Sequence, residues 1–151
     1  DAEFHAVWMS MVIHHVPDFG ACARELRRAL APGGVVIIRN AFSGGLGGIL
    51  MFEFFPSALA IDTARLPTVA RVRSVFEAAG FSIVADEEVE QTLALSFDEF
   101  VERTRKRNAS TFELISDAEF AEGIRRMETV AASGARPGPV REKIGLLVFR
   151  R

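Results

Sequence analysis

Two adjacent histidines, His14 and His15, follow an almost uniformly apolar stretch, residues 4–13. An imidazole has an ordinary pKa of about 6.5, so either ring can take a proton from a substrate hydroxyl at neutral pH. The alternative interpretation is one buried structural histidine and one solvated one. The chain has only three histidines and one cysteine, and no two share a helical face, so the pattern does not indicate zinc or another metal site.

A second group of candidate residues follows the next apolar stretch, residues 35–38. Asn40 cannot act as a base, but its amide can orient a substrate by hydrogen bonding, or it can simply form a turn. The aromatic side chains of Phe42, Phe52 and Phe55 can wall a pocket for an apolar or aromatic substrate. Their alternative interpretation is an ordinary core or a dimer surface.

The elements that must position these side chains are two strands and the helix between them. Residues 4–13 predict a strand buried on both faces. Asp18 is expected to be the N-cap of a helix that continues to Leu30. The Pro32-Gly33-Gly34 sequence that follows is expected to stop this helix. A strand, a helix and a second strand with short loops form a right-handed crossover unit, so the expected fold class is α/β.

The remainder of the chain predicts further helices and strands. Residues 43–67 are rich in glycine and then in apolar side chains, which favours a partly helical lid. Gly80 is expected to end a helix over residues 68–79, and residues 83–89 and 144–149 are expected to be strands. Ser96 with Glu99, and Ser116 with Glu119, are capping boxes that open two helices. Leu95 and Phe100 would form a hydrophobic staple at the first.

The composition excludes several classes of protein. Apolar residues make up 49% and charged residues 25%, with a net charge of −2, so no nucleic-acid surface is indicated. The longest apolar run, residues 46–55, is too short to cross a membrane. The single cysteine, Cys22, cannot form an internal disulfide, which fits a reducing cytoplasm.

Two motifs resemble those of a known family. Residues 6–18 contain an apolar strand, a histidine pair, a short turn and an acidic residue, and residues 26–34 contain an arginine, apolar residues and Pro-Gly-Gly. At this spacing the chain resembles the C-terminal half of class I S-adenosylmethionine-dependent methyltransferases of the small-molecule branch. The resemblance implies that Ser10 and Met11 face the methionine part of the cofactor S-adenosylmethionine.

The resemblance also implies an organisation. Residues 1–151 would be a single methyltransferase-like domain, the C-terminal part of a Rossmann-like sheet, mostly parallel with an antiparallel last strand. It would carry the lid at 43–67 and a helical insertion at 96–133. The glycine-rich loop that grips the cofactor in the family is missing from the sequence, so we expect a fragment that is inactive alone. The implied reaction of the parent protein is methyl transfer to a small, apolar or aromatic molecule.

Two alternatives remain open at this point. The chain can be a non-catalytic dimerisation or binding module derived from that fold, because its first strand offers an open, apolar edge for pairing with another chain. This edge predicts a homodimer. A weaker alternative is another α/β fold, such as part of a dehydrogenase domain. No nucleic acid or membrane is expected as a partner.

Overall fold

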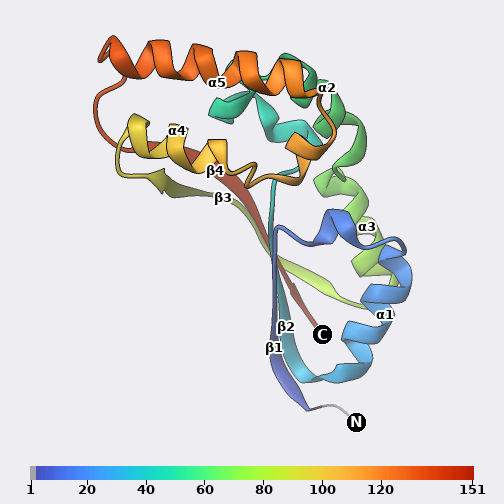
Figure 1. Ribbon diagram of the computed structural model, residues 1–151. Coiled ribbons are helices and arrows are strands. Elements are labelled where there is room, and N and C mark those ends of the chain that lie inside the picture. Colours follow the sequence, from blue (N-terminus) through green and yellow to red (C-terminus); the bar gives the residue numbers. More distant parts are fainter. Residues whose placement is uncertain (1–2) are drawn as a thin grey trace. The chain divides into compact units, whose positions relative to one another are not determined.

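The computed structural model describes residues 3–151 (Figure 1). The strands are β1 (Phe4–Ser10), β2 (Leu30–Asn40), β3 (Ser82–Ala94) and β4 (Val140–Arg150). The α-helices are α1 (Phe19–Ala29), α2 (Pro56–Arg65), α3 (Val69–Ala78), α4 (Phe97–Arg105) and α5 (Asp117–Ala132). Short 3₁₀ segments lie between them: η1 (Ile13–His15), η2 (Ser43–Gly48), η3 (Leu50–Glu53) and η4 (Ser110–Glu113).

The described strands form one sheet in the order β1-β2-β4-β3. β1 runs parallel to β2, with Trp8 opposite Ile37, and β4 runs antiparallel to β2, with Val148 opposite the same Ile37. The α/β class and the antiparallel last strand predicted from the sequence are therefore confirmed. β1 lies at an edge of this sheet, so one side of its backbone has no neighbouring strand among residues 3–151.

The chain divides into two compact units. The first, which we call the sheet unit, comprises residues 3–45, 65–89 and 144–151. The second, the helical unit, comprises residues 46–64 and 90–143. Most of the predicted lid and all of the predicted helical insertion belong to the helical unit, and β3 and β4 contribute residues to both units. The single domain with a lid stays a prediction.

The core of the sheet unit forms where α1 and α3 pack on the same face of the strands (Figure 1). Asp18 caps α1 by accepting a hydrogen bond from the Ala21 N–H at 2.8 Å, as predicted. Gly80 ends α3 in the left-handed region, with φ of +87°, and Phe81 then packs its ring 5.5 Å from that of Phe76. The two signals predicted from the sequence thus mark where α1 begins and where α3 ends.

The first strand differs from its prediction in length and in burial. It ends at Ser10 instead of residue 13, and Trp8 is 58% exposed, so burial on both faces is wrong. In residues 3–151, α1 and α3 cover one face of β1 and β2, and the buried Met9 points to that face. An apolar run shows that both faces of a strand can be buried. It does not show that other segments are present to cover both faces.

The core of the helical unit is built mainly from aromatic rings. Phe55, Phe112 and Phe120 form a triangle with ring centroids between 4.9 and 5.7 Å apart. Gly123 of α5 lies directly against this triangle, and a Cβ atom added there would come within 2.1 Å of the Phe55 ring. The absence of a side chain at this position therefore lets α5 approach Phe55.

The two predicted helix starts in the helical unit are confirmed. The Ser96 hydroxyl accepts from the Glu99 N–H, and the Ser116 hydroxyl accepts from the Glu119 N–H, each at 3.1 Å. The predicted staple at the first cap is wrong, because Leu95 is 78% exposed and its side chain lies in solvent. The Leu95 N–H instead donates to the Glu99 carboxylate at 2.7 Å, so a polar contact closes this cap.

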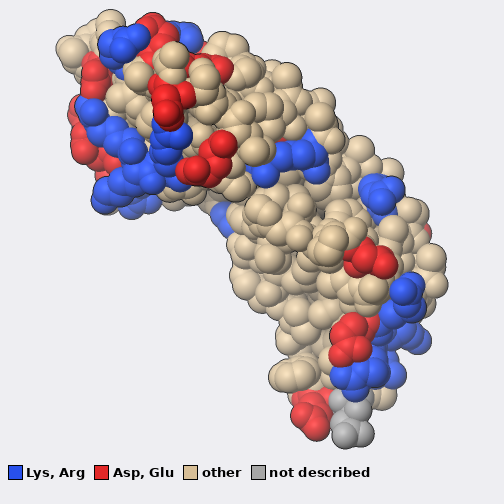
Figure 2. Space-filling view, turned by 45° about the vertical axis from the view of Figure 1, so that its right-hand side comes forward, with Lys and Arg blue, Asp and Glu red and all other residues tan. Residues whose placement is uncertain are grey.

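Side chains of both charges are interspersed on the face shown in Figure 2. Exposed ion pairs such as Arg28–Glu25 and Arg73–Asp86, both 2.6 Å long, join neighbouring surface positions. Exposed pairs of this kind contribute at most about 1 kcal/mol each, so burial of apolar side chains accounts for more of the stability. None of the helices in residues 3–151 is both long and apolar enough to cross a bilayer.

Candidate active site at the ends of strands β1 and β2

The carboxyl ends of β1 and β2 lie side by side, because the strands are parallel and Ser10 pairs with Arg39. Open α/β sheets bind their ligands at this end of the strands. β1 stops at Ser10 because Met11 takes a left-handed conformation, with φ of 53°, while its N–H donates to the Arg39 carbonyl oxygen at 2.8 Å. This turn leads into η1, which carries both histidines.

His14 and Asn40 are joined by a hydrogen bond across the two strand ends. Asn40 is 0% exposed, its amide nitrogen donates to the Ala41 carbonyl oxygen at 2.6 Å, and its Oδ1 lies 3.0 Å from Nδ1 of His14. Because Oδ1 can only accept, Nδ1 of His14 must carry the hydrogen. In the neutral imidazole the lone pair is then on Nε2. The buried amide thus selects the tautomer in which Nε2 accepts a proton.

The two histidines have different surroundings. His14 is half-buried, whereas His15 is exposed, with its ring centroid 4.1 Å from that of His14. Ile13, which precedes them, is fully buried and anchors η1 to the sheet unit. This geometry favours His14 as the residue that performs chemistry and His15 as its neighbour on the solvent side.

Ser10 is hydrogen-bonded to Arg39, which is not among the site residues predicted from the sequence. The Arg39 guanidinium donates to the Ser10 hydroxyl oxygen at 2.7 Å, and both side chains are half-buried. Since that oxygen accepts, the Ser10 hydroxyl hydrogen can be offered to a carboxylate together with the guanidinium. A cation placed directly after four apolar strand residues was the signal in the sequence that could have found Arg39.

The predicted substrate-binding aromatics fall into different units. Phe42 belongs to the sheet unit and packs against Gly145, where an added Cβ would lie 2.5 Å from its ring. Phe52 and Phe55 belong to the helical unit, whereas Asn40 belongs to the sheet unit. Phe55 is 0% exposed inside the aromatic triangle, so its ring is a core element, while Phe52 is half-buried.

Within residues 3–151, no three His, Cys, Asp or Glu side chains converge as metal ligands. Burial raises the pKa of the Cys22 thiol above its ordinary value, which disfavours the reactive thiolate. Cys22 is half-buried and packs against the core of the sheet unit.

Comparisons with known proteins bear directly on this arrangement. Residues 1–38 match the family model described as a methyltransferase domain. A candidate methyltransferase from an antibiotic biosynthesis pathway of Anabaena variabilis is 13% identical, with a TM-score of 0.71, and the match covers 100% of this chain and 68% of that one. The fold is that of the class I methyltransferases.

Two further solved structures share this methyltransferase fold. A candidate sarcosine dimethylglycine methyltransferase from Galdieria sulphuraria is 20% identical, with a TM-score of 0.54, over 99% of this chain and 54% of that one. Mycolic acid cyclopropane synthase CmaA1, solved with SAH and CTAB, is 14% identical, with a TM-score of 0.51, over 100% of this chain and 56% of that one. The predicted resemblance is confirmed, and the dehydrogenase alternative is set aside.

The chain spans between 54% and 68% of the length of these three structures. The residues matched by the family model end within β2. They include β1, η1 and α1, the elements that position Ser10 and His14. At identities of 13–20% the likeness to solved structures establishes the fold, while the reaction has to be argued from the side chains at the strand ends.

Proposed function

We propose that this chain is part of an S-adenosylmethionine-dependent methyltransferase that acts on a small molecule. The observation that carries the proposal is the 3.0 Å hydrogen bond between His14 and Asn40 at the joined ends of two parallel strands. It sets a proton acceptor at the end of the sheet where this fold binds ligands. The relative CmaA1, solved with SAH, supports S-adenosylmethionine as the cofactor.

The residues at the strand ends fit the amino-acid end of this cofactor. The Ser10 hydroxyl and the Arg39 guanidinium, 2.7 Å apart, are donors suited to a carboxylate, and Met11 is exposed just beyond them. When bound, the cofactor supplies a methyl group activated by a positively charged sulfur. Nε2 of His14 then takes the proton from the acceptor hydroxyl, and Asn40 keeps the ring in the required tautomer.

The acceptor is proposed to be small and apolar or aromatic, with Phe42, two positions after Asn40 in the chain, as its aromatic contact in the sheet unit. The sequence has no GxGxxG loop to hold the rest of the cofactor, and the chain covers about half to two thirds of its structural relatives. We therefore propose that residues 1–151 do not turn over alone, and that methyl transfer belongs to the complete protein.

An NMR titration of this chain tests the cofactor part of the proposal. S-adenosylhomocysteine and free methionine, up to millimolar concentrations, should shift the amide signals of Ser10, Met11 and Arg39. Adenosine, which lacks the amino-acid end, should leave these signals in place. Unchanged signals with all three compounds would contradict a cofactor site here and favour the non-catalytic module.

Two variants of the complete protein test the catalytic part. His14→Gln should lower the rate of methyl transfer to a phenolic acceptor by about 10²–10⁴-fold, the range of a lost general base. His15→Gln is the matched control and should lower it much less, because His15 is exposed and it is His14 that bonds to Asn40. Equal losses in both variants would contradict the role assigned to His14.

The second candidate function, a dimerisation module, is favoured by β1. This strand is at the sheet edge, and Phe4 and Trp8 on it are both more than half exposed. Such an edge can pair with the same strand of a second copy. Light scattering at micromolar concentrations should show a homodimer, and a monodisperse monomer would contradict it.

A cytoplasmic location is proposed as well, because the single cysteine fits a reducing compartment.

A further inference from the structure

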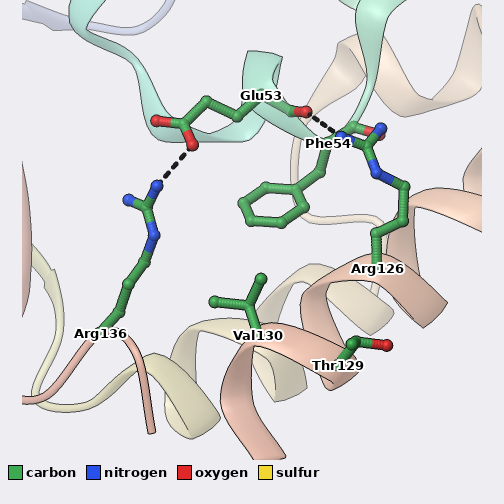
Figure 3. A pocket seen from close by; sticks show the side chains of 6 residues that line it. All are labelled: Glu53, Phe54, Arg126, Thr129, Val130 and Arg136. Carbon is green, nitrogen blue, oxygen red and sulfur yellow. Dashed lines mark hydrogen bonds and ion pairs between the residues drawn. The ribbon is translucent and has the colours of Figure 1, made fainter. Parts of the chain in front are cut away.

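The helical unit contains a cavity of about 370 Å³ that the proposed reaction does not use. Figure 3 shows its walls: α5 provides one side, the end of η3 the opposite side, and the turn after α5 the rim. The residues that line it are Glu53, Phe54, Arg126, Thr129, Val130 and Arg136. Its volume lies within the range of small-molecule sites, roughly 300–1,000 Å³.

The lining of this cavity contains two guanidinium groups and one carboxylate. Arg126 donates to the carbonyl oxygens of Glu53, at 2.8 Å, and Phe54, at 3.4 Å, and so holds the end of η3 against α5. Arg136 pairs with the Glu53 carboxylate at 2.5 Å (Figure 3). The lining therefore carries two positive charges and one negative charge, an excess of one positive charge.

The ion pair between Glu53 and Arg136 can be broken by a competing anion. The two side chains are 56% and 42% exposed, and a solvent-exposed pair of this kind is worth at most about 1 kcal/mol. Arg126, in contrast, is fixed by its two backbone acceptors and by its position 5.8 Å from the Phe54 ring. An incoming anion can therefore replace the Glu53 carboxylate at Arg136 without disturbing the wall.

The same pair also borders a second cavity of about 420 Å³ in the helical unit. Its lining includes the Gly47–Gly48 backbone, Ile49, Leu50 and the Pro137–Gly138–Pro139 turn. Glu53 and Arg136 line both cavities, so they stand where one meets the other. Moving the Glu53 side chain away would extend the space available to the body of a ligand whose charged group is held by Arg136.

We propose that this is a binding site for a small monocarboxylate with an apolar or aromatic body, and this inference is independent of the methyl-transfer site. One excess positive charge matches a monoanion. A guanidinium matches the planar carboxylate with two parallel hydrogen bonds. Phe54 and Val130 supply the apolar wall for the body. Glu53 is then a built-in competitor that occupies Arg136 in the absence of ligand.

Phenylacetate is a suitable probe, with phenylacetamide as its neutral counterpart. In an NMR titration of the chain, phenylacetate should shift the amide signals of Val130 and Arg136, and phenylacetamide should bind at least about tenfold more weakly, as expected for a lost charge-assisted hydrogen bond. Equal binding of both compounds, or no shift with either, would overturn the proposal. Inorganic phosphate should bind no better than phenylacetate, and a clear preference for phosphate would contradict the carboxylate assignment.

Substitutions at the ion pair separate competition from simple packing. Glu53→Gln should tighten phenylacetate binding by roughly threefold to fivefold, because an exposed ion pair of up to about 1 kcal/mol no longer competes. Arg136→Gln should weaken it about tenfold. Arg125→Gln is the matched control, since Arg125 pairs with Glu122 on α5 and does not line the cavity, and its affinity should not change. Unaltered or weaker binding in Glu53→Gln would refute the competitor role.

Discussion

The sheet unit and the helical unit differ in how completely their own apolar side chains are buried. In the helical unit, Phe55 and Phe112 are at most 2% exposed and pack ring against ring with Phe120. In the sheet unit, α1 and α3 cover one face of the strands, and Trp8 on the other face is 58% exposed. The helical unit thus encloses its own core, whereas the described residues of the sheet unit leave Trp8 on the second face of the sheet exposed.

This difference matters because the candidate active site is in the sheet unit. His14 and Asn40 are held by a partly buried hydrogen bond on the covered face, next to the buried Ile13 and Phe42. Ser10 and Arg39 pair with each other at the same strand ends. The polar site can therefore be preformed even though Trp8 on the other face of the sheet is exposed, and the two properties can be tested separately.

The largest expected effect concerns the covered face of the sheet unit. Phe76→Ala should lower the free energy of unfolding by about 4 kcal/mol, because Phe76 is fully buried and stacks 4.7 Å from Phe149. Trp8→Ser on the other face should change it by about 0.5 kcal/mol or less, as at most surface positions. Urea denaturation measures both. A loss of several kcal/mol in Trp8→Ser would show that the second face is covered after all.

The next effect concerns the aromatic triangle of the helical unit. Gly123→Ala should cost about 3 kcal/mol, because the new methyl would overlap the Phe55 ring, which has no room to move. Gly47→Ala is the matched control in the same unit, since an added Cβ there meets nothing within 4 Å. If both glycine variants unfold at the same urea concentration as the parent chain, the packing described for α5 is incorrect.

Local signals in the sequence predicted most of the fold. The cap at Asp18, the glycine at Gly80 and the serines at Ser96 and Ser116 each act within a few residues, and the structure confirms all four. The errors concern burial. An exposed Trp8 cannot be predicted from an apolar run, because burial depends on which other segments are present to cover the strand.

The candidate site was predicted as residue types but not as contacts. The sequence indicates His14 and Asn40 separately, yet their hydrogen bond joins residues 26 positions apart and depends on the register of β1 on β2. The Ser10–Arg39 bond depends on the same register. The pair of Glu53 and Arg136, 83 positions apart, has no local signal at all.

A smaller effect is expected at the buried amide of the sheet unit. Asn40→Ala should cost about 2 kcal/mol, the penalty for leaving buried polar partners such as the Ala41 carbonyl oxygen without their donor. ¹⁵N NMR of the imidazoles should also show His14 changing from one tautomer to a mixture. Asn108→Ala, at an exposed position, should alter neither quantity. An unchanged His14 tautomer in Asn40→Ala would mean that another group fixes the ring.

The smallest effect is a dependence of stability on pH at the start of α4. The backbone N–H of Leu95, and then Arg103, hold the pKa of the Glu99 carboxyl below its ordinary 4.5. A depressed pKa in the folded state means that this stabilisation is complete above pH 4.5 and is lost as the pH falls through the folded pKa. Glu99→Gln should therefore lower the urea midpoint at neutral pH, and its difference from the parent chain should shrink below pH 4.5.

The control for this last effect is Glu102→Gln on the same helix. Glu102 pairs with Arg105 at 3.1 Å, one turn beyond the cap. Glu102→Gln should therefore lose stability at acid pH in the same way as the parent chain. A Glu99→Gln difference that stays constant from neutral to acid pH would show that the carboxylate is not tied to the Leu95 N–H. The cap of α4 would then rest on the Ser96 hydroxyl, and the exposed Leu95 would have no compensating polar contact.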